Sequence, residues 1–245
     1  FATIEKAMEE GRGVYENIRK SVIFLLSSNL GEIMTMFTAV LLGLAAPLKS
    51  SHILWINLIT DSLPALALGM DKNNGDSLMR RPPRGVKESL FAGGGLACTC
   101  FYGILIAAIS LTAFLVVPYE ILTGRAIPVT LAGIAGVLEN PLLLARAQTY
   151  AFTVLGISQL FHAVGMRNIR RSVFLMNHRE NLWMAAACIV GFLLQFAVTS
   201  HPFLVEAFGT VRLDAAEWLR LIVLASFPMI AHEIMAFLYA FSKGK

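Results

Sequence analysis

Two apolar segments near the start of the chain each carry an acidic residue. One segment contains Asn29 and Glu32, and the other contains Asn57, Thr60 and Asp61. A carboxylate at the centre of a bilayer costs about 2.5–3.5 kcal/mol on insertion scales, so acids at such positions are usually retained for a function. Residues three or four apart share one face of a helix, so each segment presents its polar side chains together.

The chemistry of these five polar side chains suits a cation. If the two helices pack with these faces together, two carboxylates, two amide oxygens and one hydroxyl converge. Oxygen ligands with two negative charges favour a hard divalent cation, Ca²⁺ before Mg²⁺. The set holds no Cys or His, which argues against zinc and copper, whereas Mn²⁺ also accepts oxygen ligands and is the main competitor. The alternative is that Asn and Thr only link neighbouring helices, but it leaves the two acids unexplained.

The composition indicates an integral membrane protein. Of the 245 residues, 56% are hydrophobic and 15% are charged, whereas soluble domains carry about one quarter charged residues. The net charge is only +4 and the basic residues cluster between hydrophobic runs, which points to membrane topology rather than nucleic-acid binding. The three cysteines lie in apolar runs without a CxxC motif, so we interpret them as small hydrophobic residues.

The elements that position the candidate residues are apolar stretches of about 20 residues, the length needed to cross a bilayer. They predict an all-α membrane protein with six transmembrane helices and a cytoplasmic helical stalk at the N-terminus. The stalk is residues 1–20, and the six-helix domain is residues 21–245. Pro64 interrupts the second span, as is tolerated where a helix lines a cavity. The spans are residues 21–44, 53–70, 92–117, 148–166, 182–200 and 219–241.

The basic loops predict the orientation. Because positively charged loops stay in the cytoplasm, loops 71–91 and 167–181 and both termini are expected there. The small loops favour a bacterial plasma membrane. The chain begins with Phe1 instead of Met, and we expect it to be a piece of a longer polypeptide. The basic residues of the two loops are Lys72, Arg80, Arg81, Arg84 and Lys87, and Arg167, Arg170, Arg171 and Arg179.

Residues 10–20 read EGRGVYENIRK and residues 27–32 read SSNLGE. These stretches resemble the stalk and fifth membrane helix of the P-type calcium ATPases of the sarcoplasmic-reticulum type. Residues 54–69 (LWINLITDSLPALALG) resemble the sixth helix of that family nearly position for position, and residues 81–84 (RPPR) resemble the loop that follows. The resemblance covers the whole chain and implies membrane helices five to ten of a ten-helix pump.

The resemblance also implies roles for individual residues. Asn57 and Asp61 would serve the calcium site shared by most family members, and Asn57 favours the calcium branch because sodium/potassium pumps typically carry an acid there. Asn29, Glu32, Thr60 and Asp61 would serve a second site, which a Glu of the eighth helix completes in sarcoplasmic-reticulum-type pumps.

In this chain Gln159 aligns with that Glu. The glutamine amide keeps an oxygen ligand but loses the negative charge. Plasma-membrane-type pumps also have Gln there and move one calcium, although they lack the acid that matches Glu32. We therefore expect one transported Ca²⁺, with Glu32 acting as a proton carrier in countertransport. A lone His162 in the same span is expected to link helices rather than to bind an ion.

The parts of the family that use ATP are missing from this chain. It lacks the phosphorylated aspartate in its Asp-Lys-Thr-Gly-Thr motif, and it holds no glycine-rich phosphate loop. We expect no catalytic residue here, with ATP and Mg²⁺ bound by other parts of the parent pump and with the isolated chain inactive. The expected partners are the lipid bilayer and the missing N-terminal helices and cytoplasmic domains of the same pump.

Two other functions remain open at this point. The chain could form a stand-alone channel or carrier for divalent cations that uses the same acids. It could also be a structural membrane bundle whose ion site is incomplete.

Overall fold

The computed structural model describes residues 2–243 except 73–78, 80–81, 83–84 and 86–87. Every regular element among these residues is a helix, and none of them lies in a strand, which confirms the all-α class. Most of the predicted basic loop 71–91, including Arg80, Arg81, Arg84 and Lys87, lies outside the described residues.

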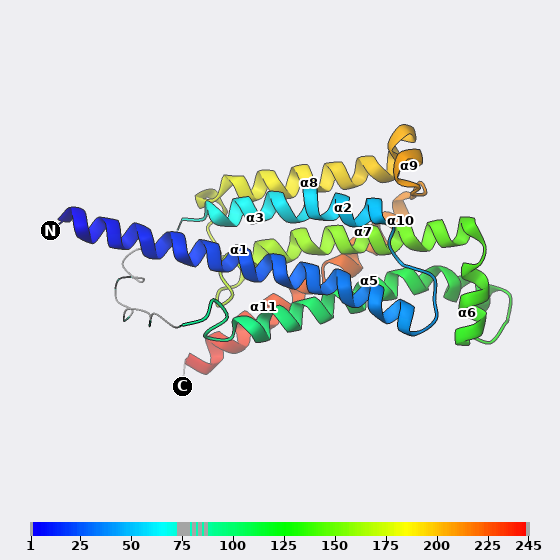
Figure 1. Ribbon diagram of the computed structural model, residues 1–245, viewed down its shortest axis with the longest axis horizontal. Coiled ribbons are helices and arrows are strands. Elements are labelled where there is room, and N and C mark those ends of the chain that lie inside the picture. Colours follow the sequence, from blue (N-terminus) through cyan, green and yellow to red (C-terminus); the bar gives the residue numbers. More distant parts are fainter. Residues whose placement is uncertain (1, 73–78, 80–81, 83–84, 86–87, 244–245) are drawn as a thin grey trace.

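Helix α1 is a single element that joins the predicted stalk to the first predicted span. It runs over Ala2–Leu41 without interruption, 40 residues in all. At a rise of about 1.5 Å per residue it is about 60 Å long, roughly twice the hydrocarbon thickness of a bilayer. Its N-terminal part extends beyond the other helices (Figure 1). It ends just before Gly43, whose φ of +69° suits the left-handed turn that closes many helices.

The second predicted span consists of three helical pieces. These are α2 (Ser50–Trp55), the π-helix η1 (Ile56–Asp61) and α3 (Ser62–Gly69). The predicted interruption is therefore present, but it takes the form of a π turn that precedes Pro64. Proline lacks an N–H and its ring collides with the carbonyl one turn earlier, which here belongs to Thr60. An inserted residue widens the turn and relieves this collision.

The remaining helices follow in chain order. Asn140, Asn181 and Asp214 cap the N-termini of α7, α8 and α10 by accepting hydrogen bonds from backbone N–H groups. The elements are α5 (Gly95–Gly124), α6 (Leu131–Leu138), α7 (Pro141–Met166), the short 3₁₀ turns η2 (Val173–Leu175) and η3 (His178–Glu180), α8 (Leu182–Ser200), α9 (Pro202–Phe208), α10 (Ala215–Ala225) and α11 (Phe227–Lys243).

Four helical stretches among the described residues are long and apolar enough to cross a membrane. They are Thr3–Leu41, Gly95–Gly124, Leu182–Ser200 and Ala215–Phe241. The other two predicted spans do not meet this criterion. Residues 53–70 are divided among three short pieces, and α7 carries several polar residues although its length suffices. The count of six spans therefore stays a prediction.

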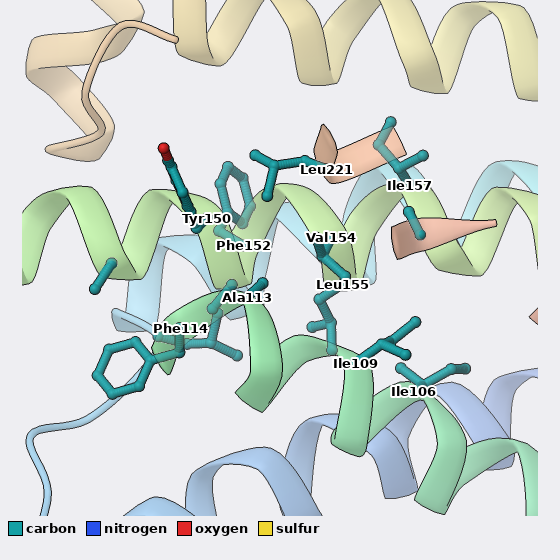
Figure 2. Close-up of a cluster of buried hydrophobic side chains, with 14 of the residues drawn as sticks. Ile106, Ile109, Ala113, Phe114, Tyr150, Phe152, Val154, Leu155, Ile157 and Leu221 are labelled. Carbon is teal, nitrogen blue, oxygen red and sulfur yellow. The ribbon is translucent and has the colours of Figure 1, made fainter. Parts of the chain in front are cut away.

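Helix α7 forms the centre of the bundle. It is buried continuously from Ala147 to Leu160, and Figure 1 shows it enclosed by the other long helices. A helix buried on all sides needs neighbours all round rather than one apolar stripe. Apolar side chains of α5, α7 and α10 meet in one cluster (Figure 2), which includes Ile106, Ile109, Phe152, Leu155 and Leu221.

Helices α1 and α5 approach each other closely through two glycines. A Cβ added at Gly31 would lie 2.8 Å from Cγ2 of Ile106, and one added at Gly103 would lie 2.9 Å from Cβ of Leu30. Small residues at such crossings let membrane helices pack without a gap. This contact holds the Glu32 segment in place against the bundle.

We predict that Gly103→Ala lowers the stability of the protein by about 1–3 kcal/mol, because the added methyl group has no space against Leu30. Gly124→Ala is the matched control in the same helix, since a Cβ there meets nothing within 4 Å. Thermal unfolding of the detergent-purified protein measures both. Equal transition temperatures for the two variants would show that the close contact is absent.

Candidate cation site

Three helices bring buried polar side chains together in the middle of the bundle. Glu32 comes from α1, Thr60 and Asp61 from η1, and Gln159 from α7, and each is at most 5% exposed. The Thr60 hydroxyl donates to Oε1 of Gln159 at 2.8 Å, and Nε2 of Gln159 donates to Oε1 of Glu32 at 3.3 Å. Gln159 therefore bridges the two segments that carry the acids.

The Asp61 carboxylate is the least satisfied group of this cluster. It is 1% exposed, and neither of its oxygens has a hydrogen-bond partner among the described residues. The Ser28 hydroxyl approaches it, but the pair does not meet the distance and angle limits of a hydrogen bond. Glu32 is near enough to act on it electrostatically. A buried carboxylate without partners is costly, and a bound cation would remove that cost.

Asn57 and Asn29 lie less centrally than the other predicted residues. The Asn57 side chain is exposed, and its Nδ2 donates to the Ile53 carbonyl at 3.0 Å and to Oε2 of Glu32 at 3.5 Å, the limit of a hydrogen bond. Asn29 is half-buried and makes no hydrogen bond to the other predicted residues in the described part of the chain. The structure thus brings together four of the six predicted residues, with Asn57 at the margin.

Asn57 lies apart from Thr60 and Asp61. In an α-helix the spacing of Asn57, Thr60 and Asp61 would place all three on one face. Here the three residues belong to the π-helix η1. Thr60 and Asp61 face the bundle while Asn57 points outward. The Ser62 hydroxyl donates to the Asn57 carbonyl at 2.7 Å and helps to satisfy the backbone of this turn.

Gln195 of α8 is a polar neighbour that the sequence analysis did not single out. It is fully buried, and its Oε1 accepts from the Trp55 indole at 3.2 Å. A Cβ on Gly156 would meet this oxygen at 3.1 Å and the Thr60 methyl at 3.5 Å, so Gln195 and Thr60 both lie against Gly156. The sequence contains a signal for Gln195, because a glutamine within an apolar span of 19 residues is unusual.

The oxygen ligands at this candidate site suit a hard cation. No group of three His, Cys, Asp or Glu side chains that could hold a metal occurs in the part of the chain that the structure describes. Two carboxylates, a hydroxyl and amide oxygens are available instead, and these are the ligands that Ca²⁺ uses.

His162, one turn from Gln159, makes a different kind of contact. Its Nε2 lies 2.7 Å from the Ser27 hydroxyl, which in turn donates to the Phe24 carbonyl at 2.8 Å. The imidazole also packs against the ring of Tyr102. His162 therefore connects α7 to α1, and within the described residues it makes no hydrogen bond to the acids.

Comparison with known proteins identifies relatives over nearly the whole chain. Residues 45–238 match the family described as "Cation transporting ATPase, C-terminus". The chain is 41% identical over 237 residues to calcium-transporting ATPase 1 of Bacillus cereus, covering 96% of this chain and 26% of that protein.

Two further relatives agree with this match. The chain is 40% identical over 228 residues to a calcium-transporting ATPase of Bacillus subtilis, covering 93% of this chain and 23% of the relative. It is 30% identical over 256 residues to the endoplasmic reticulum-type calcium-transporting ATPase 3 of Arabidopsis thaliana, covering 97% and 24% respectively. The chain thus spans about a quarter of the length of these curated relatives.

We predict that Thr60→Val destabilises the protein by about 1 kcal/mol, because it leaves Oε1 of the buried Gln159 without its donor. Thr112→Val is the matched control, since Thr112 also donates to the carbonyl four residues earlier but is exposed and has no partner on another helix among the described residues. Denaturation of the purified protein in detergent measures the difference. If both variants unfold alike, the bond between Thr60 and Gln159 contributes nothing.

Proposed function

The chain belongs to the cation-transporting ATPase family as its C-terminal part, and on this premise we propose that it supplies ion ligands to an ATP-driven Ca²⁺ pump. The observation that carries the proposal is the buried Asp61 carboxylate, which Glu32 affects electrostatically and which has no hydrogen-bond partner among the described residues. Curated relatives that share 40–41% of its residues are named as calcium-transporting ATPases. Ca²⁺ is the transported substrate in this proposal, with Mn²⁺ as the competing ion.

The ligands would come from three helices of this chain. Asp61 and Glu32 provide the negative charge that offsets a divalent cation. Thr60 and Gln159 provide neutral oxygens at the same depth. Asn29 and Asn57 complete the proposed set from its margins. Because Asn57 faces outward, it is suited to join ligands from a part of the pump that precedes this chain.

The outward face beside Asn57 supports a contact with such an upstream part. Leu54 and Leu58 flank Asn57 on this face and are 69% and 62% exposed. Ile33 of α1, next to Glu32, is 63% exposed as well. In the intact pump we propose that upstream membrane helices cover this apolar surface and close the site. The isolated chain would then bind Ca²⁺ weakly and, without the parts that bind ATP and Mg²⁺, would be inactive.

Energy coupling would pass through α1. This helix runs unbroken from the proposed stalk, residues 1–20, to Glu32, so a displacement of the stalk reaches the site. The Asn17 amide also donates to the carbonyls of Gly69 at 3.1 Å and Asp71 at 2.7 Å. The stalk is therefore bonded to the end of α3, and both acid-bearing segments would move with it.

The membrane arrangement that suits this role has six spans with both termini in the cytoplasm. Two spans are added to the four apolar ones: the 20 residues from Ser50 to Gly69, and α7 with 26 residues. Both are long enough to cross a bilayer. Because α7 is enclosed by other helices, its polar residues do not face lipid. The bacterial relatives support a plasma membrane as the location.

We predict that Asp61→Asn in the full-length pump raises the Ca²⁺ concentration for half-maximal phosphorylation by ATP at least about tenfold, because a buried charge opposite the ion is lost. Glu139→Gln is the control, since it removes an exposed carboxylate between α6 and α7. Phosphoenzyme formation is measured against free Ca²⁺, with Mn²⁺ titrated in parallel. An unchanged Ca²⁺ dependence in Asp61→Asn would contradict the proposed site.

We also predict that the pump binds one Ca²⁺ per phosphorylation site, because Gln159 contributes no charge and the two carboxylates together offset one divalent cation. Glu32 takes up a proton once that ion has left. Gln159→Glu adds a third carboxylate and is expected to raise the number towards two. Equilibrium binding of radioactive Ca²⁺ to the purified pump gives this ratio. Two ions bound to the unsubstituted protein would overturn the assignment.

A further inference from the structure

A second polar region lies at the end of the bundle that carries both chain termini (Figure 1). A cavity of about 800 Å³ opens there between α1, the start of α5 and the residues that follow α7. Among its described lining residues, six are basic and three are acidic, so positive charge is in excess. The basic residues are Arg19, Lys20, Lys72, Arg167, Arg170 and Arg171.

Arg167 is the lining residue of this cavity whose side-chain hydrogen bonds are incomplete among the described residues. Its side chain is 6% exposed. Nε donates to Oδ1 of Asp71 at 3.0 Å, and Nη2 lies 2.9 Å from the same oxygen and donates to the Asn177 carbonyl at 3.5 Å. Its Nη1 is buried and has no hydrogen-bond partner among the described residues. A guanidinium carries five N–H donors, and leaving some of them buried and unpaired is costly. An anionic oxygen in the cavity would satisfy this nitrogen.

The N-terminus of α5 faces the same cavity. Gly93, Gly94 and Gly95 line it, and Gly94 is an N-cap whose side chain cannot cap the helix. The N–H groups of Gly95 and Cys98 are bonded to the carbonyls of Phe91 and Gly94, so the start of this 30-residue helix contributes its dipole, which favours anions. Arg19 holds the residues that precede α5. Its Nε donates to the Leu90 carbonyl at 2.9 Å, and its Nη2 donates to the Ala92 carbonyl.

The position of the cavity indicates where the anion comes from. It lies at the start of α5 and midway along α1, and both belong to the stretches that are apolar enough to cross a membrane. It is therefore at the level of lipid headgroups. Exposed apolar residues adjoin it in sequence, namely Leu96 after the glycines and Phe174 and Leu175 after the arginines. Basic pockets between membrane helices on the cytoplasmic side bind anionic headgroups.

We propose that this cavity binds the phosphate group of an anionic phospholipid. Arg167 Nη1 donates to a phosphate oxygen and the N-terminal dipole of α5 favours its negative charge. The exposed Arg170 and Arg171 add attraction for the headgroup. The proposal does not depend on which ion the pump transports.

The test uses the full-length pump in detergent and native mass spectrometry, with phosphatidylglycerol and phosphatidylcholine as probes. Tighter binding of phosphatidylglycerol is expected. Arg171→Gln should weaken it about fivefold, the effect of one basic residue near an anionic headgroup. Arg179→Gln is the matched control, because Arg179 lies in the same connection but does not line the cavity. Arg171 is exposed, so its replacement is tolerated even if Arg167→Gln fails to fold.

Competition with inorganic phosphate tests whether the bound phosphate group belongs to a lipid or to free phosphate. We expect millimolar phosphate to leave phosphatidylglycerol bound, since free phosphate lacks the apolar contacts. Displacement of the lipid by phosphate at that concentration would overturn the lipid as the source. Equal binding of the two lipids, or an equal loss in Arg171→Gln and Arg179→Gln, would overturn the site itself.

Discussion

The burial of the Asp61 carboxylate inside a helix bundle is the constraint on which the arrangement of this protein depends. A charged group enclosed by apolar helices must find opposite charge or polar partners, because water is excluded. A second acid, Glu32, acts on it electrostatically, which makes the position worse for a chain without a cation. The surrounding polar residues reduce this cost only in part, since Gln159 donates to Glu32 and Asp61 has no hydrogen-bond partner in the part of the chain that the structure describes.

The π turn is the local solution that lets the backbone present these groups. An ordinary α-helix would bring the Thr60 carbonyl against the Pro64 ring. The wider turn avoids this collision within the segment that carries the polar residues, where Thr60 reaches α7 and Asn57 remains on the outer surface. The polar residues of this segment are therefore divided between the bundle interior and a face suited to further helices. Such turns are frequent at functional sites.

Much of this arrangement could be predicted from the residues themselves. The apolar runs indicate the helices, and acids within such runs stand out because membranes exclude them. Gln159 could be found only through the resemblance, since a single glutamine in a helix does not reveal which neighbour it meets. The π turn could not be predicted, because the spacing argument assumes an α-helical period, and the outward position of Asn57 depends on how this segment packs against the other helices. Gln195 stands out as a glutamine within an apolar span, but its partner Trp55 is 140 positions away in the sequence, and only the packing of α8 brings them together.

The site and the topology depend on each other through α7. This helix carries so many buried polar residues that it does not qualify as a span by composition, yet its burial keeps those residues away from lipid. Its position is held at both ends. Arg167 pairs with Asp71 at one end, and Arg146 and Tyr150 bond to Glu217 of α10 at the other. Because the two contacts are about five turns apart on one rigid helix, they set the depth of Gln159 between them. A helix that is too polar to face lipid is thus placed by ion pairs at its ends, and this placement puts a neutral amide against Glu32 and Thr60.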